Sequence, residues 1–100
     1  MNKRESMILK RSLGILKKAL RPRRIVLFGS RAKGTNRHGS DFDLALDCRT
    51  PKLIEEERIR EKLSEGAGLY HIDLVFLPSV SRDFRKIILN TGKVLYARRG

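Results

Sequence analysis

The stretch that decides the fold is GSRAKGTNRHGSDFDLAL, which runs from Gly29 to Leu46. It begins with a glycine–serine pair and continues as a loop rich in glycine, arginine and lysine, in which one helical turn is expected directly after Gly29. It ends with two aspartates that flank a phenylalanine. The apolar run RIVLF at 24–28 comes directly before it and predicts a buried strand that enters a tight turn. Residues 41–46 alternate between polar and apolar, which predicts a second, half-buried strand.

Three well-known phosphate and metal motifs do not fit this stretch. A Walker A loop needs lysine and then serine or threonine after its last glycine, but threonine and asparagine follow Gly34. An EF-hand loop that began at Asp41 would need an oxygen ligand and then a glycine at the positions of Ala45 and Leu46. The dinucleotide fingerprint Gly-x-Gly-x-x-Gly is absent. All three motifs are therefore excluded.

The strand period brings the acidic residues together. Side chains two residues apart in a strand point to the same face, so Asp41 and Asp43 share a face and the intervening apolar residues face the core. The run HIDLVFL at 71–77 predicts a third strand, in which Asp73 lies on the polar face. If the second and third strands are neighbours with their apolar faces aligned, Asp73 lies near Asp43 and three carboxylates converge.

Three neighbouring carboxylates repel one another unless a cation neutralises them or some are protonated. Carboxylate oxygens suit Mg²⁺ or Mn²⁺, which bind a few carboxylates together with substrate phosphates. The free backbone N–H groups of the turn at Gly29 and Ser30 could hold such a phosphate, and Ser30 adds a hydroxyl. The stretch indicates a phosphate-binding turn beside a metal site; the alternative is a solvated turn followed by ordinary strand-edge charges.

Periodicity and capping residues predict the other elements, and their order predicts the fold class. The fold class is α/β (α+β), with a small mixed β-sheet of three to four strands flanked by helices in one domain over residues 1–100. The order of the elements does not say which neighbouring strands run parallel. The other predicted elements are a helix over 4–20 stopped by Pro22, a helix with Thr50 as N-cap and Pro51 in its first position that ends near Gly66, a helix after Pro78 that ends at 90–92, and a short strand at 93–97.

Composition narrows the class of protein. The formal net charge of +12 implies an acidic partner such as a nucleic acid, a nucleotide phosphate or an acidic protein surface. No apolar run approaches the ~20 residues that span a bilayer, so no membrane association is expected. The basic N-terminus lacks the apolar segment of a signal peptide, and the single cysteine, Cys48, cannot form an internal disulfide. We therefore expect a cytoplasmic protein.

The spacing of Gly29-Ser30, ten residues and then Asp41-x-Asp43 resembles the signature of the nucleotidyltransferase superfamily that includes DNA polymerase β and kanamycin nucleotidyltransferase. In particular, the chain looks like the minimal nucleotidyltransferases (MNT proteins). The resemblance implies transfer of a nucleoside monophosphate from a nucleoside triphosphate such as ATP to an acceptor hydroxyl. Asp41 and Asp43 would bind two Mg²⁺ ions (or Mn²⁺), and Asp73 would be the third carboxylate ligand. Gly29 and Ser30 would grip the β- and γ-phosphates.

The resemblance also implies a partner. Larger members of the superfamily carry extra domains that hold the acceptor, and 100 residues leave no room for one, so the acceptor is expected on another molecule. Minimal members resemble the antitoxin of HEPN/MNT toxin–antitoxin pairs, which adenylylates a tyrosine of a HEPN ribonuclease toxin. The leading hypothesis is thus an ATP-dependent protein adenylyltransferase that acts as an antitoxin. The alternatives are a non-catalytic antitoxin that neutralises its partner by binding alone, and a nucleic-acid binder or RNA nucleotidyltransferase subunit.

Five other residues have weaker expectations. Arg31 and Lys33 lie next to the predicted phosphate turn and could add positive charge, but nothing in the sequence assigns them a catalytic role. His71 shares a face with Asp73 and is either a structural residue or a support for that carboxylate. We expect His38 to be an exposed loop residue and Cys48 to be inert.

Overall fold

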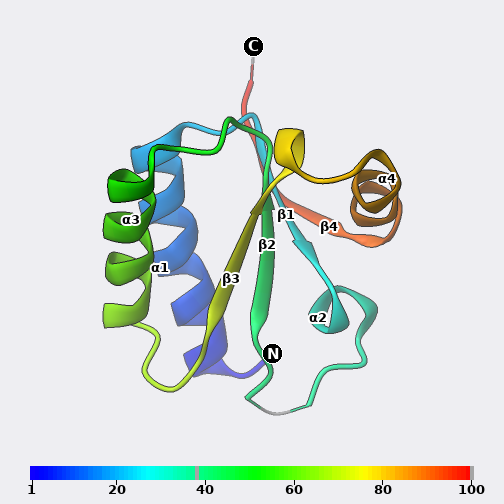
Figure 1. Cartoon of the computed structure of the whole chain (residues 1–100). Helices are drawn as coiled ribbons and strands as arrows, with labels where there is room; N and C mark the ends of the chain where they lie inside the picture. The colour runs from blue at the N-terminus through cyan, green and yellow to red at the C-terminus, as the bar shows by residue number, and fades with distance from the viewer. Residues whose placement is uncertain (38, 100) are drawn as a thin grey trace.

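A four-stranded mixed β-sheet lies at the centre of the structure, a computed structural model that describes residues 1–37 and 39–99. The strand order is β3-β2-β1-β4 (Figure 1), in which β1 is antiparallel to both of its neighbours and β2 is parallel to β3. This confirms the predicted fold class. The elements are α1 (Lys3–Leu20), β1 (Arg24–Phe28), α2 (Ser30–Lys33), β2 (Phe42–Leu46), α3 (Leu53–Glu65), β3 (Ile72–Phe76), a 3-10 turn (Leu77–Ser79), α4 (Arg82–Thr91) and β4 (Lys93–Ala97).

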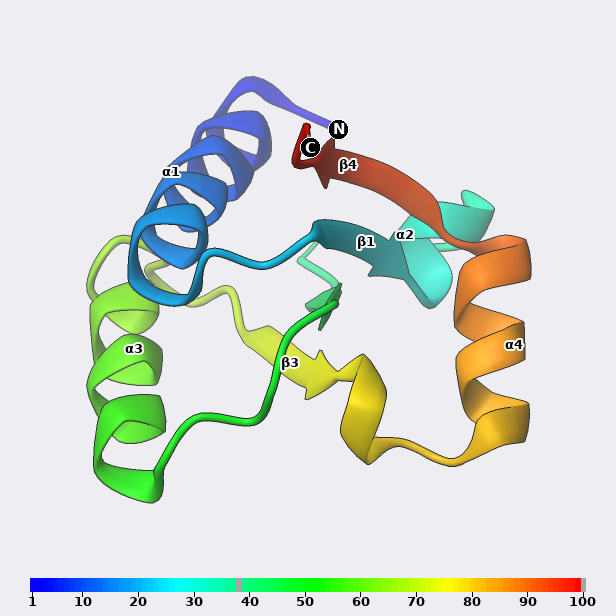
Figure 2. The same ribbon diagram turned by 90° about the horizontal axis from the view of Figure 1, so that it is seen from above.

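The helices divide between the two faces of the sheet. Figure 2 shows α1 and α3 on one face and α2 and α4 on the other. The main hydrophobic core lies between the sheet and the α1/α3 layer, and α1 contributes its buried residues Ile8, Leu9 and Leu16. A much smaller cluster, formed by Val26, Ala45, Leu77 and Ile88, lies on the α2/α4 face.

Local sequence signals set the two ends of α1. Asn2 caps its start, because the Asn2 side chain accepts a hydrogen bond from the Glu5 backbone at 2.8 Å while the Glu5 carboxylate accepts one from Asn2. The helix ends at Arg21, whose φ of 47° is left-handed, directly before Pro22. The predicted stop at Pro22 is confirmed.

The two strands that carry the acidic residues are parallel neighbours in matching register. Parallel strands cannot be joined by a tight hairpin, and α3 makes the connection between β2 and β3. Phe42 pairs with Ile72 and Asp43 pairs with Asp73 along the ladder. Because the apolar residues of both strands point toward α1 and α3, their alternate residues point to the α2/α4 face.

The start of α3 differs from the prediction. The helix begins at Leu53, and Lys52 occupies the N-cap position without a side-chain hydrogen bond, so Thr50 is not the cap. The Thr50 hydroxyl instead lies 2.6 Å from the hydroxyl of Ser79, where it joins the loops after β2 and β3. That tertiary contact competes with capping for the same hydroxyl.

Smaller differences concern the ends of elements and the loop. The helical turn expected after Gly29 is α2, and β2 begins at Phe42, one residue after Asp41. The expectation for His38 falls outside the described residues. Among the helices that the structure describes, none is long and apolar enough to cross a membrane.

Candidate active site

Gly29 lies at the end of β1, directly against the aspartate of the neighbouring strand. Its φ of +72° is left-handed, a conformation that residues with a side chain adopt only at a cost. A Cβ at this position would collide with Oδ2 of Asp43 and would lie 3.2 Å from its Cγ. Glycine is therefore needed twice, for the turn and for the approach of the carboxylate. The turn and the acidic strand form one site.

Asp43 and Asp73 are adjacent on β2 and β3, at the same level of the ladder. Burial raises the pKa of Asp43 above its usual value, the negative charges of Asp73 and then Asp41 raise it further, and a hydrogen bond with Asp73 also contributes. The two carboxylates thus place negative charge at a site that is partly shielded from solvent. Such a position favours either a proton shared by the pair or a bound cation.

Asp41 precedes β2 and is exposed. It is close enough for its charge to affect Asp43, yet in residues 1–37 and 39–99 no three His, Cys, Asp or Glu side chains are grouped tightly enough to hold one metal ion. The structure brings together Asp43 and Asp73 and leaves Asp41 beside the pair. The ligand roles of the three aspartates remain predictions.

His71 contacts the carboxylate of Asp73. His71 directly precedes β3, and its Nε2 lies 2.8 Å from Oδ1 of Asp73, two residues later in the chain. The histidine side chain is 67% exposed, so it is not part of the hydrophobic core. This geometry favours the interpretation of His71 as a support that orients Asp73.

Arg31 points away from the site, although it follows Ser30 directly. Its guanidinium is buried and donates hydrogen bonds to the Ser40 carbonyl, at 2.6 and 3.0 Å, and to the Asp41 carbonyl at 3.2 Å. It also lies 4.0 Å from the centre of the Phe42 ring. Arg31 therefore binds the backbone that carries Asp41 into β2. Its position next to Ser30 in the sequence suggested that Arg31 could add positive charge to the phosphate turn, but its guanidinium is directed elsewhere.

The fourth contact of Arg31 is an ion pair with Glu5 of α1. The N–O distance is 2.9 Å, and the side chains of Arg31 and Glu5 are only 2% and 5% exposed. The hydrogen bond from Arg31, followed by that from the Asn2 backbone, lowers the pKa of Glu5 to about 2. The start of α1, the turn at Gly29 and the entry to β2 are thus joined through two buried charges.

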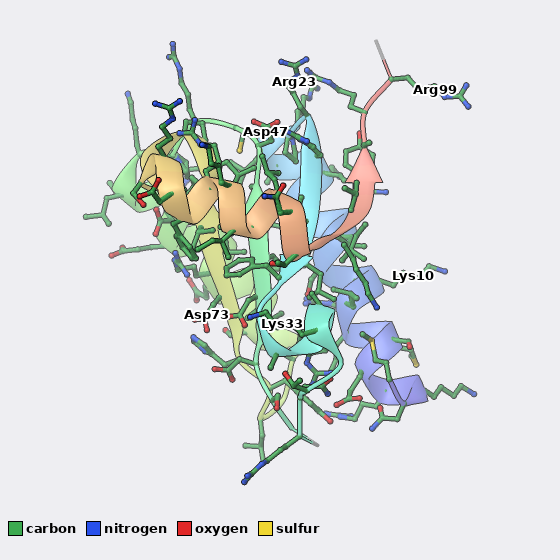
Figure 3. All side chains as sticks on the ribbon, turned by 90° about the vertical axis from the view of Figure 1, so that its right-hand side faces the viewer. Lys10, Arg23, Lys33, Asp47, Asp73 and Arg99 are labelled. Carbon is green, nitrogen blue, oxygen red and sulfur yellow. The ribbon has the colours of Figure 1, made fainter. Side chains whose placement is uncertain are left out.

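Figure 3 shows the α2/α4 face, with Asp73 and Lys33 drawn below α4. The ring of Phe84 in α4 packs edge-on against Phe28 at a centroid distance of 5.9 Å, which fixes α4 over the sheet beside the site. Lys33 is exposed and belongs to α2. Of the two basic residues beside the turn, Lys33 is the one whose charge remains available to an anion.

Comparison with known proteins agrees with this arrangement. The family described as polymerase beta, nucleotidyltransferase, matches residues 12–99. The chain belongs to this nucleotidyltransferase family. The matched range includes the turn, both acidic strands and α4.

Individual relatives are similar in sequence and in structure. A Haemophilus influenzae protein named "Probable protein adenylyltransferase MntA" is 39% identical over 62 residues, which are 61% of this chain and 54% of that protein. The chain thus matches about half the length of this relative. A crystal structure of a toxin–antitoxin with AMP-PNP has a TM-score of 0.76 at 27% identity, over 90% of this chain and 73% of that one.

A further structure shares the fold. It is a tri-AMPylated Shewanella oneidensis HEPN toxin in complex with an MNT antitoxin, with a TM-score of 0.71 over 93% of this chain and 72% of that chain. The identity is 23%, so this likeness concerns the fold alone.

The sequence did not reveal the buried ion pair between Glu5 and Arg31 that supports the site. Neither residue has a motif that would reveal a buried ion pair 26 positions apart in the chain. The signal that was present, an acidic residue three positions after Asn2, predicts a capping box and nothing more. The tertiary contact gives that carboxylate its second partner.

Proposed function

We propose that the chain is a metal-dependent nucleotidyltransferase that transfers AMP from ATP to a tyrosine hydroxyl of a HEPN ribonuclease toxin, and so acts as its antitoxin. The observation that carries the proposal is the Asp43–Asp73 pair, with Asp41 beside it, packed against the turn at Gly29. The likeness to MntA supports adenylyl transfer, and the likeness to a toxin–antitoxin with AMP-PNP supports both the nucleotide and the type of partner.

The residues present fit a divalent cation. The donors are carboxylate oxygens, which Mg²⁺ and Mn²⁺ prefer, and the raised pKa of Asp43 reflects negative charge that a cation would neutralise. We assign Asp41, Asp43 and Asp73 as the ligands of two such ions. When bound, the ions would stabilise the attacking and leaving oxygens of the displacement.

The turn at Gly29 and Ser30 would bind the nucleotide phosphates, and His71 would orient one of the carboxylates. Gly29 and Ser30 would hold the β- and γ-phosphates through backbone N–H groups and the Ser30 hydroxyl, and the missing Cβ of Gly29 keeps this turn in contact with Asp43. His71 contacts one oxygen of Asp73 and would fix the orientation of that carboxylate. Catalysis of this type consists largely of positioning and electrostatic stabilisation, which this arrangement supplies.

We further propose that residues 1–100 form a single domain that works in the cytoplasm. Cys48 is a free cysteine, and burial followed by the charge of Asp47 raises the pKa of its thiol, which keeps it in the unreactive form. A single unreactive thiol suits a reducing compartment.

The deciding experiment is transfer of label from α-labelled ATP to the partner protein. We expect wild-type chain, with Mg²⁺ and the partner protein encoded by the neighbouring gene, to label that partner. Asp43→Asn should reduce labelling by about a thousandfold or more, as loss of a charged catalytic group commonly does. Asp47→Asn, which changes the aspartate directly after the far end of β2, is the matched control and should label normally.

The same experiment separates the alternatives. Ribonuclease activity of the partner is measured in parallel: inhibition without label would disprove adenylyl transfer and establish neutralisation by binding alone. Transfer of label to RNA rather than to protein would establish the RNA nucleotidyltransferase alternative. Independently of activity, Mg²⁺ should raise the melting temperature of wild type and of Asp47→Asn, but not of Asp43→Asn.

A further inference from the structure

The outer face of α1 carries basic side chains in a regular pattern. They form three pairs of adjacent residues, each pair seven positions after the last, and all six side chains are exposed: Lys3–Arg4, Lys10–Arg11 and Lys17–Lys18. At a rise of 1.5 Å per residue the pairs repeat about every 10.5 Å and extend over about 22 Å of one side of the helix. The acidic residue of α1, Glu5, is buried with Arg31 and does not offset these charges.

Two hollows lie along this face, where α1 runs beside the C-terminal part of α3 (Figure 2). One has a volume of about 530 Å³ and is lined by Met7 as well as basic residues, and the other has about 640 Å³ and includes Ile15 and Ala19. Arg11 lines both hollows, and its guanidinium donates a hydrogen bond to the Lys62 carbonyl of α3 at 2.9 Å, so both hollows border this side chain near the middle of the helix. We refer to these two hollows together as the groove; basic and apolar side chains both line it.

Gly14 lies in this groove in the middle of α1, and the chain's own packing does not require it. A Cβ at Gly14 would meet no atom within 4 Å, and its φ is not in the left-handed range. A glycine inside a helix costs stability relative to alanine, and one use of glycine is to allow close approach between the backbone and a ligand. Exposed Met7 lies seven positions earlier, at the equivalent place between the first two basic pairs.

We infer that this face of α1 is a docking surface for an amphipathic helix of a partner protein, with acidic residues repeated every seven positions. A helix is the ligand whose own side-chain repeat matches a seven-residue spacing, and its apolar stripe would cover Met7 and Ile15. The open space at Gly14 would let its backbone approach. A nucleic-acid backbone offers charge but no apolar stripe, and so would leave the apolar side chains of the groove uncovered. The glutamates of α3 line neither hollow among the described residues.

This surface faces away from the candidate active site, because α1 covers the sheet face opposite α2 and α4 (Figure 2). Figure 3 shows Lys10 projecting from α1, away from the sheet. Variants of the groove therefore leave Gly29 and the three aspartates intact. The inference goes beyond the proposed chemistry and can fail or hold without it.

The test measures binding of two synthetic peptides to the full chain at physiological salt. Each has about 21 residues of the same glutamate, leucine and alanine composition, but only one repeats glutamate pairs every seven positions with leucine between them. We expect the patterned peptide to bind at least about tenfold more tightly than the scrambled one. Lys10→Glu/Lys18→Glu should abolish this preference, whereas Arg82→Glu/Lys86→Glu, the same charge change on α4, should retain it.

A second variant separates docking from general charge and from unfolding. Gly14→Leu adds a side chain that the chain has room for, so it should stay folded by circular dichroism while binding of the patterned peptide weakens by about tenfold. Equal binding of both peptides, or equal loss in the two charge variants, would overturn the inference. Tight binding of a short RNA that only the α1 variant abolishes, with no peptide preference, would overturn it in favour of a nucleic-acid surface.

Discussion

The two faces of the sheet use the same strands for different purposes. On the α1/α3 face, Phe42 and Leu44 are fully buried in the main core, whereas on the other face the alternate residue between them, Asp43, is only half-buried beside Asp73. The first face holds the fold together. The second face accepts repulsion between carboxylates, which reduces stability but supplies the charge that a cation requires.

The comparison shows how a small protein separates stability from function. Because successive side chains point to opposite faces, one five-residue strand can supply both core and candidate site. Two buried charges, Glu5 and Arg31, connect the faces. Arg31 belongs to α2, directly after the turn at Gly29, and it forms its ion pair with Glu5 of α1, which covers the opposite face. The predictions below test this separation, beginning with the largest expected effect.

Neighbouring substitutions in β2 should have opposite consequences. Leu44→Ala removes a fully buried side chain and should reduce the free energy of unfolding by about 3 kcal/mol. Asp43→Asn should leave stability at neutral pH unchanged or slightly raised, because it removes repulsion with Asp73, yet abolish label transfer. Urea denaturation with the transfer assay checks both. If Asp43→Asn proved as destabilising as Leu44→Ala, the separation of the two faces would be wrong.

The ion pair that connects the faces should make stability depend on acid pH. Because the folded state lowers the pKa of Glu5 to about 2, its contribution is present above pH ~4.5 and is lost as pH falls toward about 2. Glu5→Gln should therefore be less stable than wild type at pH 7, and the difference should shrink over that window. Thermal unfolding at several pH values measures it. The control is Glu57→Gln, at an exposed position of α3, and a pH-independent difference for Glu5→Gln would contradict the assignment.

Two glycines of the site loop should respond differently to alanine. Gly34→Ala places a side chain in the left-handed αL region, which costs about 1–2 kcal/mol. Gly29→Ala places one at φ 72° and ψ −153°, a region that only glycine adopts readily, and it also collides with Asp43. Gly34, where nothing lies within 4 Å, is the matched control. We expect Gly29→Ala to lower the free energy of unfolding at least as much as Gly34→Ala does, and we expect only Gly29→Ala to lose transfer activity. Equal activity of the two would show that the contact with Asp43 is unimportant.

The smallest expected effect is a gain in stability from the substitution Gly14→Ala. Gly14→Ala meets no neighbouring atom and replaces glycine in a helix interior, so it should raise the free energy of unfolding by about 0.5–1 kcal/mol. Differential scanning calorimetry measures the change. A loss of stability would mean that α1 needs glycine for its own packing, which would also remove one of the arguments for docking at this face.

Much of the fold was predictable because its signals are local. The strand at 24–28, the stop at Pro22 and the helical turn after Gly29 follow from short-range sterics and polarity. The start of α3 was not predictable in this way, because the hydroxyl of Thr50 forms a hydrogen bond with Ser79, a residue distant in the chain, instead of capping the helix. Local propensity is a weak guide where a long-range partner competes for the same group.

The candidate site divides in the same way. The sequence alone predicted that Asp43 and Asp73 each lie on the polar face of a strand, since a strand's two-residue period is a property of the backbone, and that a glycine–serine turn precedes them. It also placed Asp41 on the same face as Asp43, whereas in the structure Asp41 lies just before β2. Only the tertiary structure decided that β2 and β3 run parallel with Asp43 level with Asp73, and that Arg31 turns inward to Glu5. Those outcomes depend on the connection through α3 and on packing against α1, which join residues far apart in the chain.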